Sequence, residues 1–201
     1  MNLPNKLTVV RVCMIPLFLV LFFWDTLPNH YIWAFLVFAL ASLTDMLDGQ
    51  IARKRNLVTD FGKLMDPLAD KLLVMSAFIC LLGGNFYYFR PLESHSKMLG
   101  LIGLIFIMSR EFVVTSIRLV AAGKGIVIAA DKWGKLKTIS QMVWICLVLL
   151  GLGLLSWSAL PGGLVTAWLW VQDILYIVML LLTVGSGLNY VVKNRSLFAD
   201  A

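Results

Sequence analysis

The feature that most constrains the fold is a series of six apolar runs, each near the length of about 20 residues that a helix needs to cross a bilayer. Short connections separate the runs, which cover residues 8–24, 31–52, 67–83, 98–120, 138–157 and 168–190. The sequence therefore predicts an all-α integral membrane protein, a bundle of six transmembrane helices. Because no linker or low-complexity tract interrupts the chain, residues 1–201 are expected to form one membrane domain.

The composition favours the same class of protein. Hydrophobic residues make up 60% and charged residues 14% of the chain, whereas a soluble domain has about 45–50% apolar and about 25% charged residues. The first run resembles a signal peptide in length, but Arg11 lies within it and no small-residue cleavage pattern follows it. We therefore expect this run to be a helix of the mature protein.

The 17 Lys and Arg residues are unevenly distributed between the two ends of the predicted bundle. Only Arg90 and Lys97 fall on the side of the connections that follow the first, third and fifth runs. Cytoplasmic loops carry an excess of Lys and Arg, so the opposite side, with both termini, is predicted to be cytoplasmic. The basic surface, with a net charge of +6 for the chain, then faces anionic lipids, phosphate-bearing substrates or both, and nucleic acid is not an expected partner.

Histidine and cysteine are not expected to take part in the chemistry. His30 and His95 lie in or beside the outer connections and are predicted to be solvated. Cys13, Cys80 and Cys146 are isolated in apolar stretches without metal-like spacing, which is typical of small buried hydrophobic residues.

Carboxylates concentrate at the predicted cytoplasmic ends of the second and third runs, where the chain has Asp45, Asp48, Asp66 and Asp70. A carboxylate in a membrane helix is costly and usually faces a polar cavity, which makes it a candidate functional residue. Residues three or four apart lie on one face of a helix, so each pair projects from one face. Two antiparallel helices with a short connection bring such faces together, and we expect a polar cavity there that opens toward the cytoplasm.

Clustered carboxylates repel one another and keep some of their protons unless cations compensate. Oxygen ligands without His or Cys favour Mg²⁺ or Mn²⁺, which proteins commonly bind through carboxylates and substrate phosphates. The sequence therefore predicts a divalent metal site that faces a phosphate-bearing substrate. The alternative is that the aspartates cap helices or pair with basic neighbours, namely Arg53, Lys54, Arg55 and Lys63.

Small residues and one arginine accompany the aspartates. Gly49 and Ala52 continue the face of the first pair, and Gly62 lies one turn before the second pair. A missing side chain lets a nucleotide or a neighbouring backbone approach closely, although ordinary helix packing explains such residues as well. The guanidinium of Arg53 is planar and permanently charged, and it suits a diphosphate.

The chain resembles the CDP-alcohol phosphotransferases and matches each fixed position of their signature, Asp45-x-x-Asp48-Gly49-x-x-Ala52-Arg53, eight residues, Gly62-x-x-x-Asp66-x-x-x-Asp70. The resemblance implies transfer of a phosphatidyl group from CDP-diacylglycerol to a small alcohol. It also implies a centre of two Mg²⁺ or Mn²⁺ ions held by the four aspartates, with Asp70 as the catalytic general base. The implied CDP-diacylglycerol contacts are Asp45, Asp48, Gly49, Ala52, Arg53 and Gly62.

A second polar group lies on the fourth run and could select the alcohol. Arg110, Glu111, Thr115 and Arg118 are spaced so that they share one helical face. Arginine beside a metal site indicates an anionic acceptor, because paired Arg and Lys donors suit a phosphate. We therefore assign the acceptor phosphate to Arg110, Arg118 and Lys135. The alternative role for these cations is anchoring at the cytoplasmic interface.

Three further stretches, residues 2–11, 109–118 and 133–138, resemble the branch of the family that uses glycerol 3-phosphate. The resemblance thus implies glycerol 3-phosphate as acceptor and a bacterial plasma membrane as location. The alternative interpretations of the function are a family member that makes cardiolipin or phosphatidylinositol phosphate, an intramembrane prenyltransferase, or a divalent-cation transporter. Prenyltransferases lack the glycine, alanine and arginine spacing seen here. The sequence leaves the oligomeric state open, with a homodimer among the alternatives.

Overall fold

The computed structural model describes residues 3–55, 60–83, 96–126, 128, 132–157 and 161–195, and all regular structure in these ranges is helical. The elements are α1 (Leu3–Phe23), α2 (His30–Arg55), α3 (Asp60–Phe78), a π-helical segment (Ile79–Gly83), α4 (Ser96–Gly123), α5 (Lys132–Trp157) and α6 (Gly162–Lys193). They follow the order of the six predicted runs. Some helical residues are described by their backbone alone, namely 3–6, 45–55, 60–64, 66–67, 83, 96–97, 132 and 157.

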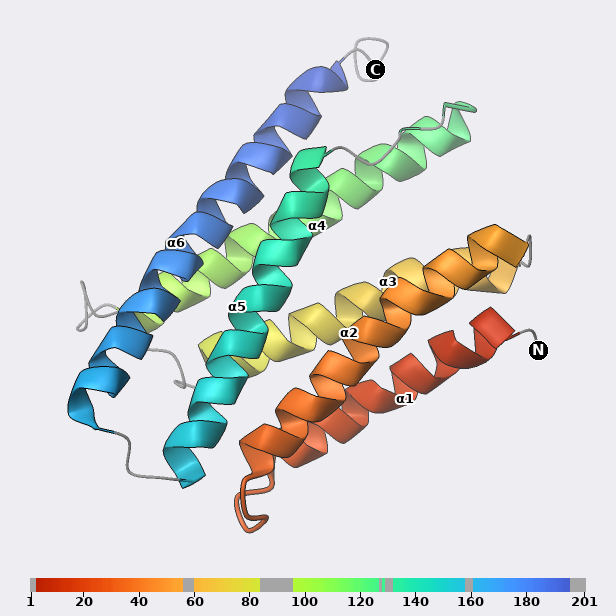
Figure 1. Cartoon of the computed structure of the whole chain (residues 1–201). Helices are drawn as coiled ribbons and strands as arrows, with labels where there is room; N and C mark the ends of the chain where they lie inside the picture. Colours follow the sequence, from red (N-terminus) through yellow and green to blue (C-terminus); the bar gives the residue numbers. More distant parts are fainter. Residues whose placement is uncertain are drawn as a thin grey trace.

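The helices run alternately in opposite directions along the bundle. Figure 1 shows the start of α1 and the ends of α2, α4 and α6 toward the upper right, and the turn between α1 and α2 at the lower left. Helix α1 packs on α2 and α3, α2 packs on α5, and α5 packs on α6, which in turn packs on α4. The charged inner ends of the helices therefore gather at one end of the molecule.

An aromatic stack links three helices at the centre of the core. The rings of Phe78 on α3 and Trp144 on α5 are stacked with their centroids 5.6 Å apart. The ring of Tyr176 on α6 lies with its centroid 5.3 Å from that of Trp144. The indole Nε1 of Trp144 donates to the backbone carbonyl of Gln172 at 3.2 Å. The polar atom of this buried side chain is therefore satisfied, as buried polar groups generally are.

Glycines allow the helices to approach closely. A Cβ atom at Gly103 of α4 would lie 2.0 Å from the Tyr176 hydroxyl of α6, and one at Gly153 of α5 would lie 2.3 Å from Ile32 of α2. Both distances are shorter than real Cβ contacts, so a side chain at either position would require its neighbour to shift. Small residues at helix contacts are typical of membrane bundles, where close packing drives association.

Helix α4 ends in a motif that depends on Gly125. This glycine has φ +74°, a backbone conformation that residues with a Cβ rarely adopt. Its N–H donates to the carbonyl of Ala122 at 3.0 Å, and the N–H of Ile126 donates to that of Ala121 at 2.8 Å. This is the Schellman arrangement of a helix C-terminus, and it ends α4 at the same end of the bundle as the charged inner ends of α2 and α6.

The chain is a membrane protein by the length and composition of its helices. Within the described residues, Met98–Gly123, Trp133–Ser156 and Gly162–Lys193 are long and apolar enough to cross a bilayer, and Leu7–Phe23 and His30–Thr44 are shorter apolar helices. Large apolar side chains on α4 and α6 are exposed, as expected of surfaces that face lipid; examples are Ile105, Phe106, Leu181 and Leu188.

Two of the sequence predictions are wrong. His30 is buried, because the turn after α1 is tight enough for its Nδ1 to lie 2.9 Å from the Phe22 carbonyl oxygen. Cys13 is exposed and Cys146 is half-buried, whereas Cys80 is buried as predicted. His95 lies outside the described residues.

Candidate active site

The signature aspartates lie on two consecutive helices that run antiparallel and contact each other. Asp45 and Asp48 are on α2, and Asp66 and Asp70 are on α3. Of these four side chains only that of Asp70 is described, and it is half-buried. The other signature residues are also placed by their helical backbone alone: Gly49, Ala52 and Arg53 on α2, and Gly62 on α3.

The donor set fits a divalent metal in its chemistry. Each aspartate pair has the spacing that puts both members on one helical face, and carboxylate oxygens suit Mg²⁺ and Mn²⁺. Among the side chains that the structure describes, no group of three or more His, Cys, Asp or Glu residues could hold a metal ion. Since Asp45, Asp48 and Asp66 lie outside that set, the metal centre stays a prediction.

A group of buried and half-buried hydrogen-bonded side chains, here called the polar cluster, joins α3, α4, α5 and α6. Its members are Lys71, Arg110, Glu111, Thr115, Lys137 and Ser186. They come from positions between 71 and 186 in the sequence, so only the fold brings them together. In a membrane protein such buried polar side chains are candidates for function.

Glu111 is the centre of the polar cluster. Its Oε1 accepts a hydrogen bond from Arg110 Nη1 at 3.1 Å and a second one from Lys137 Nζ. The exposed fractions of the three side chains are 16% for Glu111, 12% for Arg110 and 4% for Lys137. Charges this well buried need partners, because an unpaired one would pay a desolvation penalty of several kcal/mol. One carboxylate therefore fixes two cations from different helices.

Arg110 is further positioned by α6. Its Nη2 donates to Ser186 Oγ at 3.2 Å. A Cβ atom at Gly187 would lie 2.9 Å from Arg110 Cγ, so glycine at that position leaves room for the arginine stem. On α5, a Cβ at Gly134 would lie 3.7 Å from Arg110 Nη2, which is ordinary contact. The arginine is thus held between α4 and α6.

Lys71 connects the polar cluster with the signature. It follows Asp70 directly on α3, and its Nζ donates to Thr115 Oγ1. The Thr115 hydroxyl in turn donates to the Glu111 carbonyl at 2.7 Å. Asp70 is close enough to interact electrostatically with both Lys71 and Lys137. The predicted general base and the polar cluster therefore border the same region of the bundle.

The structure places the three residues assigned to the acceptor phosphate differently from one another. Arg110 lies in the polar cluster. Arg118 lies beside it, with Nε donating to Tyr190 Oη at 3.2 Å and its guanidinium 5.6 Å from the centre of that ring. Lys135 is exposed on α5. Lys135 and Lys137 are two residues apart, which corresponds to a rotation of about 200° around the helix axis, so they lie on nearly opposite sides of α5. Lys137 is buried and is the lysine that faces inward.

Among the described side chains of this region, cations outnumber carboxylates. Four cations, Lys71, Arg110, Arg118 and Lys137, lie near two described carboxylates, Asp70 and Glu111. Arg110 and Lys137 are well buried, whereas Lys71 is half-buried and Arg118 is exposed. The two buried cations are the ones that an anion inside the bundle would meet. Arg and Lys donors at this spacing suit a phosphate.

Sequence reasoning did not assign Lys71, Lys137, Ser186 or Tyr190 to the site. Periodicity offers a signal for Lys137, since it begins a buried stripe of α5 that continues through Gln141, Trp144 and Val148. For Lys71 the signal is a lysine inside an apolar helix. Ser186 and Tyr190 have no such signal, because only packing shows which side of α6 faces α4.

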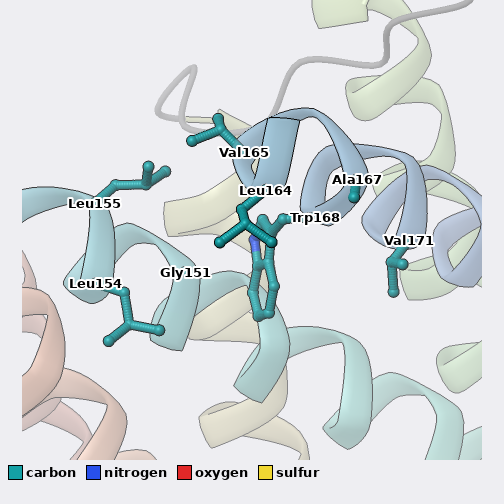
Figure 2. A pocket seen from close by; sticks show the side chains of 8 residues that line it. All are labelled: Gly151, Leu154, Leu155, Leu164, Val165, Ala167, Trp168 and Val171. Atoms are coloured by element: carbon teal, nitrogen blue, oxygen red, sulfur yellow. The ribbon is translucent and has the colours of Figure 1, made fainter. Parts of the chain in front are cut away.

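An apolar cavity lies at the opposite end of the bundle. It has a volume of about 350 Å³ and is lined by Gly151, Leu154, Leu155, Leu164, Val165, Ala167, Trp168 and Val171. Figure 2 shows the indole of Trp168 between α5 and α6, beside Gly151. The lining has no charged group, so this cavity cannot bind a phosphate or a metal ion.

Comparison with known proteins identifies relatives over most of the chain. The family model described as CDP-alcohol phosphatidyltransferase matches residues 1–185. A Bacillus subtilis protein named CDP-diacylglycerol–glycerol-3-phosphate 3-phosphatidyltransferase is 39% identical, with 96% of this chain and 95% of the relative covered. A Rickettsia typhi protein of the same name is 39% identical over 75% of this chain and 77% of its own. A Mycobacterium tuberculosis protein named probable phosphatidylglycerophosphate synthase is 35% identical over 96% and 81%.

Proposed function

This chain belongs to the CDP-alcohol phosphatidyltransferase family, and we propose that it transfers the phosphatidyl group of CDP-diacylglycerol to glycerol 3-phosphate. The products are phosphatidylglycerophosphate and CMP, so the enzyme serves anionic phospholipid biosynthesis. The observation that carries the choice of acceptor is the 39% identity to the Bacillus subtilis enzyme over 96% of this chain. The buried cations Arg110 and Lys137, of which Lys137 interacts electrostatically with Asp70, support an acceptor that carries a phosphate.

In this proposal the four aspartates hold two Mg²⁺ or Mn²⁺ ions. Bound metal supplies neutralisation of the diphosphate and stabilisation of the leaving phosphate of CMP. Gly49, Ala52 and Gly62 leave room for the nucleotide, and Arg53 contacts the diphosphate. The support is the donor chemistry together with the antiparallel contact of α2 and α3.

The transfer is a displacement at the β-phosphorus of CDP-diacylglycerol. Asp70 accepts the proton of the acceptor hydroxyl, whose oxygen forms a bond to that phosphorus. The bond from the phosphorus to the bridging oxygen breaks, and CMP leaves with its electron pair. A general base placed in this way contributes typically about 10²–10⁴-fold to the rate. The half-buried position of Asp70 next to Lys71 supports this role.

The phosphate of the acceptor is bound by Arg110 and Lys137, which Glu111 holds side by side. Arg118 and Lys71 border the same site and add charge. We give the lysine role to Lys137 rather than Lys135, because Lys137 is buried in the polar cluster and Lys135 is exposed. Glycerol 3-phosphate then lies with its phosphate in the polar cluster and its hydroxyl toward Asp70.

The distribution of basic residues supports one orientation of the protein in the membrane. We propose six membrane-spanning helices with both termini and the active site at the cytoplasmic face of a bacterial plasma membrane. The support is that 15 of the 17 Lys and Arg residues, all except Arg90 and Lys97, belong to the predicted cytoplasmic side of the bundle. In this orientation the substrates approach from the cytoplasmic leaflet.

The test is release of CMP by purified protein in detergent with CDP-diacylglycerol and Mg²⁺. Glycerol 3-phosphate is compared with glycerol, inositol phosphate, serine and phosphatidylglycerol as acceptors. Release that depends on glycerol 3-phosphate is the expected result. Release with another acceptor would move the chain to a different branch of its family, and no release with any of them would contradict the proposed activity.

A further inference from the structure

Gln141 has an unusual position for a polar residue in a membrane helix. Its exposed fraction is 1%. It follows Lys137 by one helical turn, about 6 Å along α5, on the inward stripe that continues to Trp144. Among the residues that the structure describes, its amide Nε2 has no hydrogen-bond partner. A buried side chain therefore turns an unused donor toward the interior of the bundle.

Arg110 supplies a second unused donor in the same region. Its Nη1 and Nη2 bind Glu111 and Ser186, but its buried Nε has no hydrogen-bond partner within the described part of the chain. An unsatisfied buried donor costs free energy, so native proteins rarely retain one without a reason. Arg110 precedes Glu111 on α4 and Gln141 follows Lys137 by one turn on α5, so both unused donors belong to residues next to the Glu111–Lys137 pair and can take acceptor oxygens from a ligand.

We propose that Gln141 is a specificity-determining residue whose amide donates a hydrogen bond to an uncharged glycerol oxygen of a bound substrate. This inference rests on the proposed function. A neutral amide suits a hydroxyl or an ester carbonyl, whereas Arg110 and Lys137 suit the phosphate. Two substrate oxygens have this chemistry: the central hydroxyl of glycerol 3-phosphate and the ester carbonyls of CDP-diacylglycerol.

The experiment is a comparison of kcat/KM for wild type and Gln141→Leu with matched substrates. In one arm glycerol 3-phosphate is compared with 3-hydroxypropyl phosphate, which lacks the central hydroxyl. In the other arm CDP-diacylglycerol is compared with its ether-linked analogue, which lacks the ester carbonyls. Loss of one hydrogen bond corresponds to a factor of roughly three to ten. Wild type should prefer the complete substrate by that factor in one arm, and Gln141→Leu should lose the preference in the same arm.

Thermal unfolding without substrates provides an independent measurement. Replacing an unsatisfied buried donor by an apolar side chain of similar size is neutral or stabilising, so Gln141→Leu should unfold at the same temperature as wild type or higher. A residue with a purely structural role would lower that temperature. Gln172→Leu is the matched control, because Gln172 is also buried but lies on α6 beside Trp144. It should leave both substrate preferences unchanged.

Gln141→Glu keeps the shape of the side chain and replaces the donor, so it tests the same hydrogen bond if the leucine variant does not fold. Equal effects of the Gln141 variants on both members of each substrate pair would overturn the inference. An absence of preference in wild type in both arms would do so as well. Failure of the proposed function is recognised separately, because wild type would then not turn over glycerol 3-phosphate at all.

Discussion

Glu111 shows how a single carboxylate determines the geometry of the proposed anion site. Without it, Arg110 and Lys137 would repel each other inside the bundle, since both are well buried. With it, their donors are fixed at one oxygen, and these three side chains together keep one positive charge. A phosphate that enters meets cations that are already in place, which lowers the entropic cost of ordering them.

Exchange of Lys137 for methionine should raise the KM for glycerol 3-phosphate by roughly tenfold or more, the factor expected for a lost charged hydrogen bond. The KM for CDP-diacylglycerol should change much less. Steady-state kinetics at saturating levels of the second substrate measure both constants. The comparison variant is Lys135→Met, whose side chain is exposed. A larger effect of Lys135→Met than of Lys137→Met would contradict the assignment of the buried lysine.

Exchange of Asp70 for asparagine should lower kcat by about 10²–10⁴-fold, because the amide cannot accept the proton of the acceptor hydroxyl. The shape of the side chain is retained, so the unfolding temperature in detergent should change little. Release of CMP reports the chemical step. Turnover near the wild-type rate would exclude Asp70 as the base.

At the scale of whole helices, α4 and α6 form one wall of the proposed acceptor site. Arg110 binds Ser186, and Arg118 binds Tyr190. These contacts are one helical turn apart on α6, so the register of the two helices aligns both arginines at once. Gly187 makes the alignment possible, because any side chain there would meet the stem of Arg110.

The variant Gly187→Ala should displace Arg110, since the new Cβ would lie 2.9 Å from Cγ of the arginine. We expect the KM for glycerol 3-phosphate to rise roughly fivefold, the factor for about 1 kcal/mol of strain. Gly185→Ala is the control on the same helix, because a Cβ at Gly185 has no atom within 4 Å. Kinetics of both variants in one detergent preparation test this, and equal behaviour of the two would argue against a packing role for Gly187.

At the scale of the whole molecule, the two ends of the bundle have different chemistry. One end gathers the inner ends of α2, α4 and α6 with the signature and the polar cluster. The other end has the apolar cavity between α5 and α6. A lipid substrate with a charged nucleotide head and apolar chains fits such a molecule, because head and chains are solvated by different parts of the membrane.

Removal of divalent metal should abolish the transfer, because the clustered aspartates would then repel both one another and the diphosphate. Treatment with EDTA followed by measurement of CMP release tests this. Addition of Mg²⁺ or Mn²⁺ in excess should restore activity, whereas Ca²⁺, a larger ion with looser geometry, should restore less. Full activity after chelation would contradict the metal centre.

The sequence alone was sufficient to predict helices and their order, because apolar length and helix formation are local properties of the chain. It also identified the signature, since Asp45, Asp48, Asp66 and Asp70 lie within 26 residues on two neighbouring helices. Arg110 was found from its spacing on one helix. These features depend on contacts between residues that are close in sequence.

Only the tertiary structure decided which lysine belongs to the polar cluster and which other residues complete that cluster. Lys135 and Lys137 look alike in the sequence, but packing of α5 turns Lys137 inward to Glu111 and leaves Lys135 exposed. Ser186 became a candidate only through the packing of α6 on α4, and Gln141 only through its burial and its unpartnered amide. The reason is physical: direction around a helix axis is set by the neighbours against which the helix packs, and those neighbours are distant in sequence.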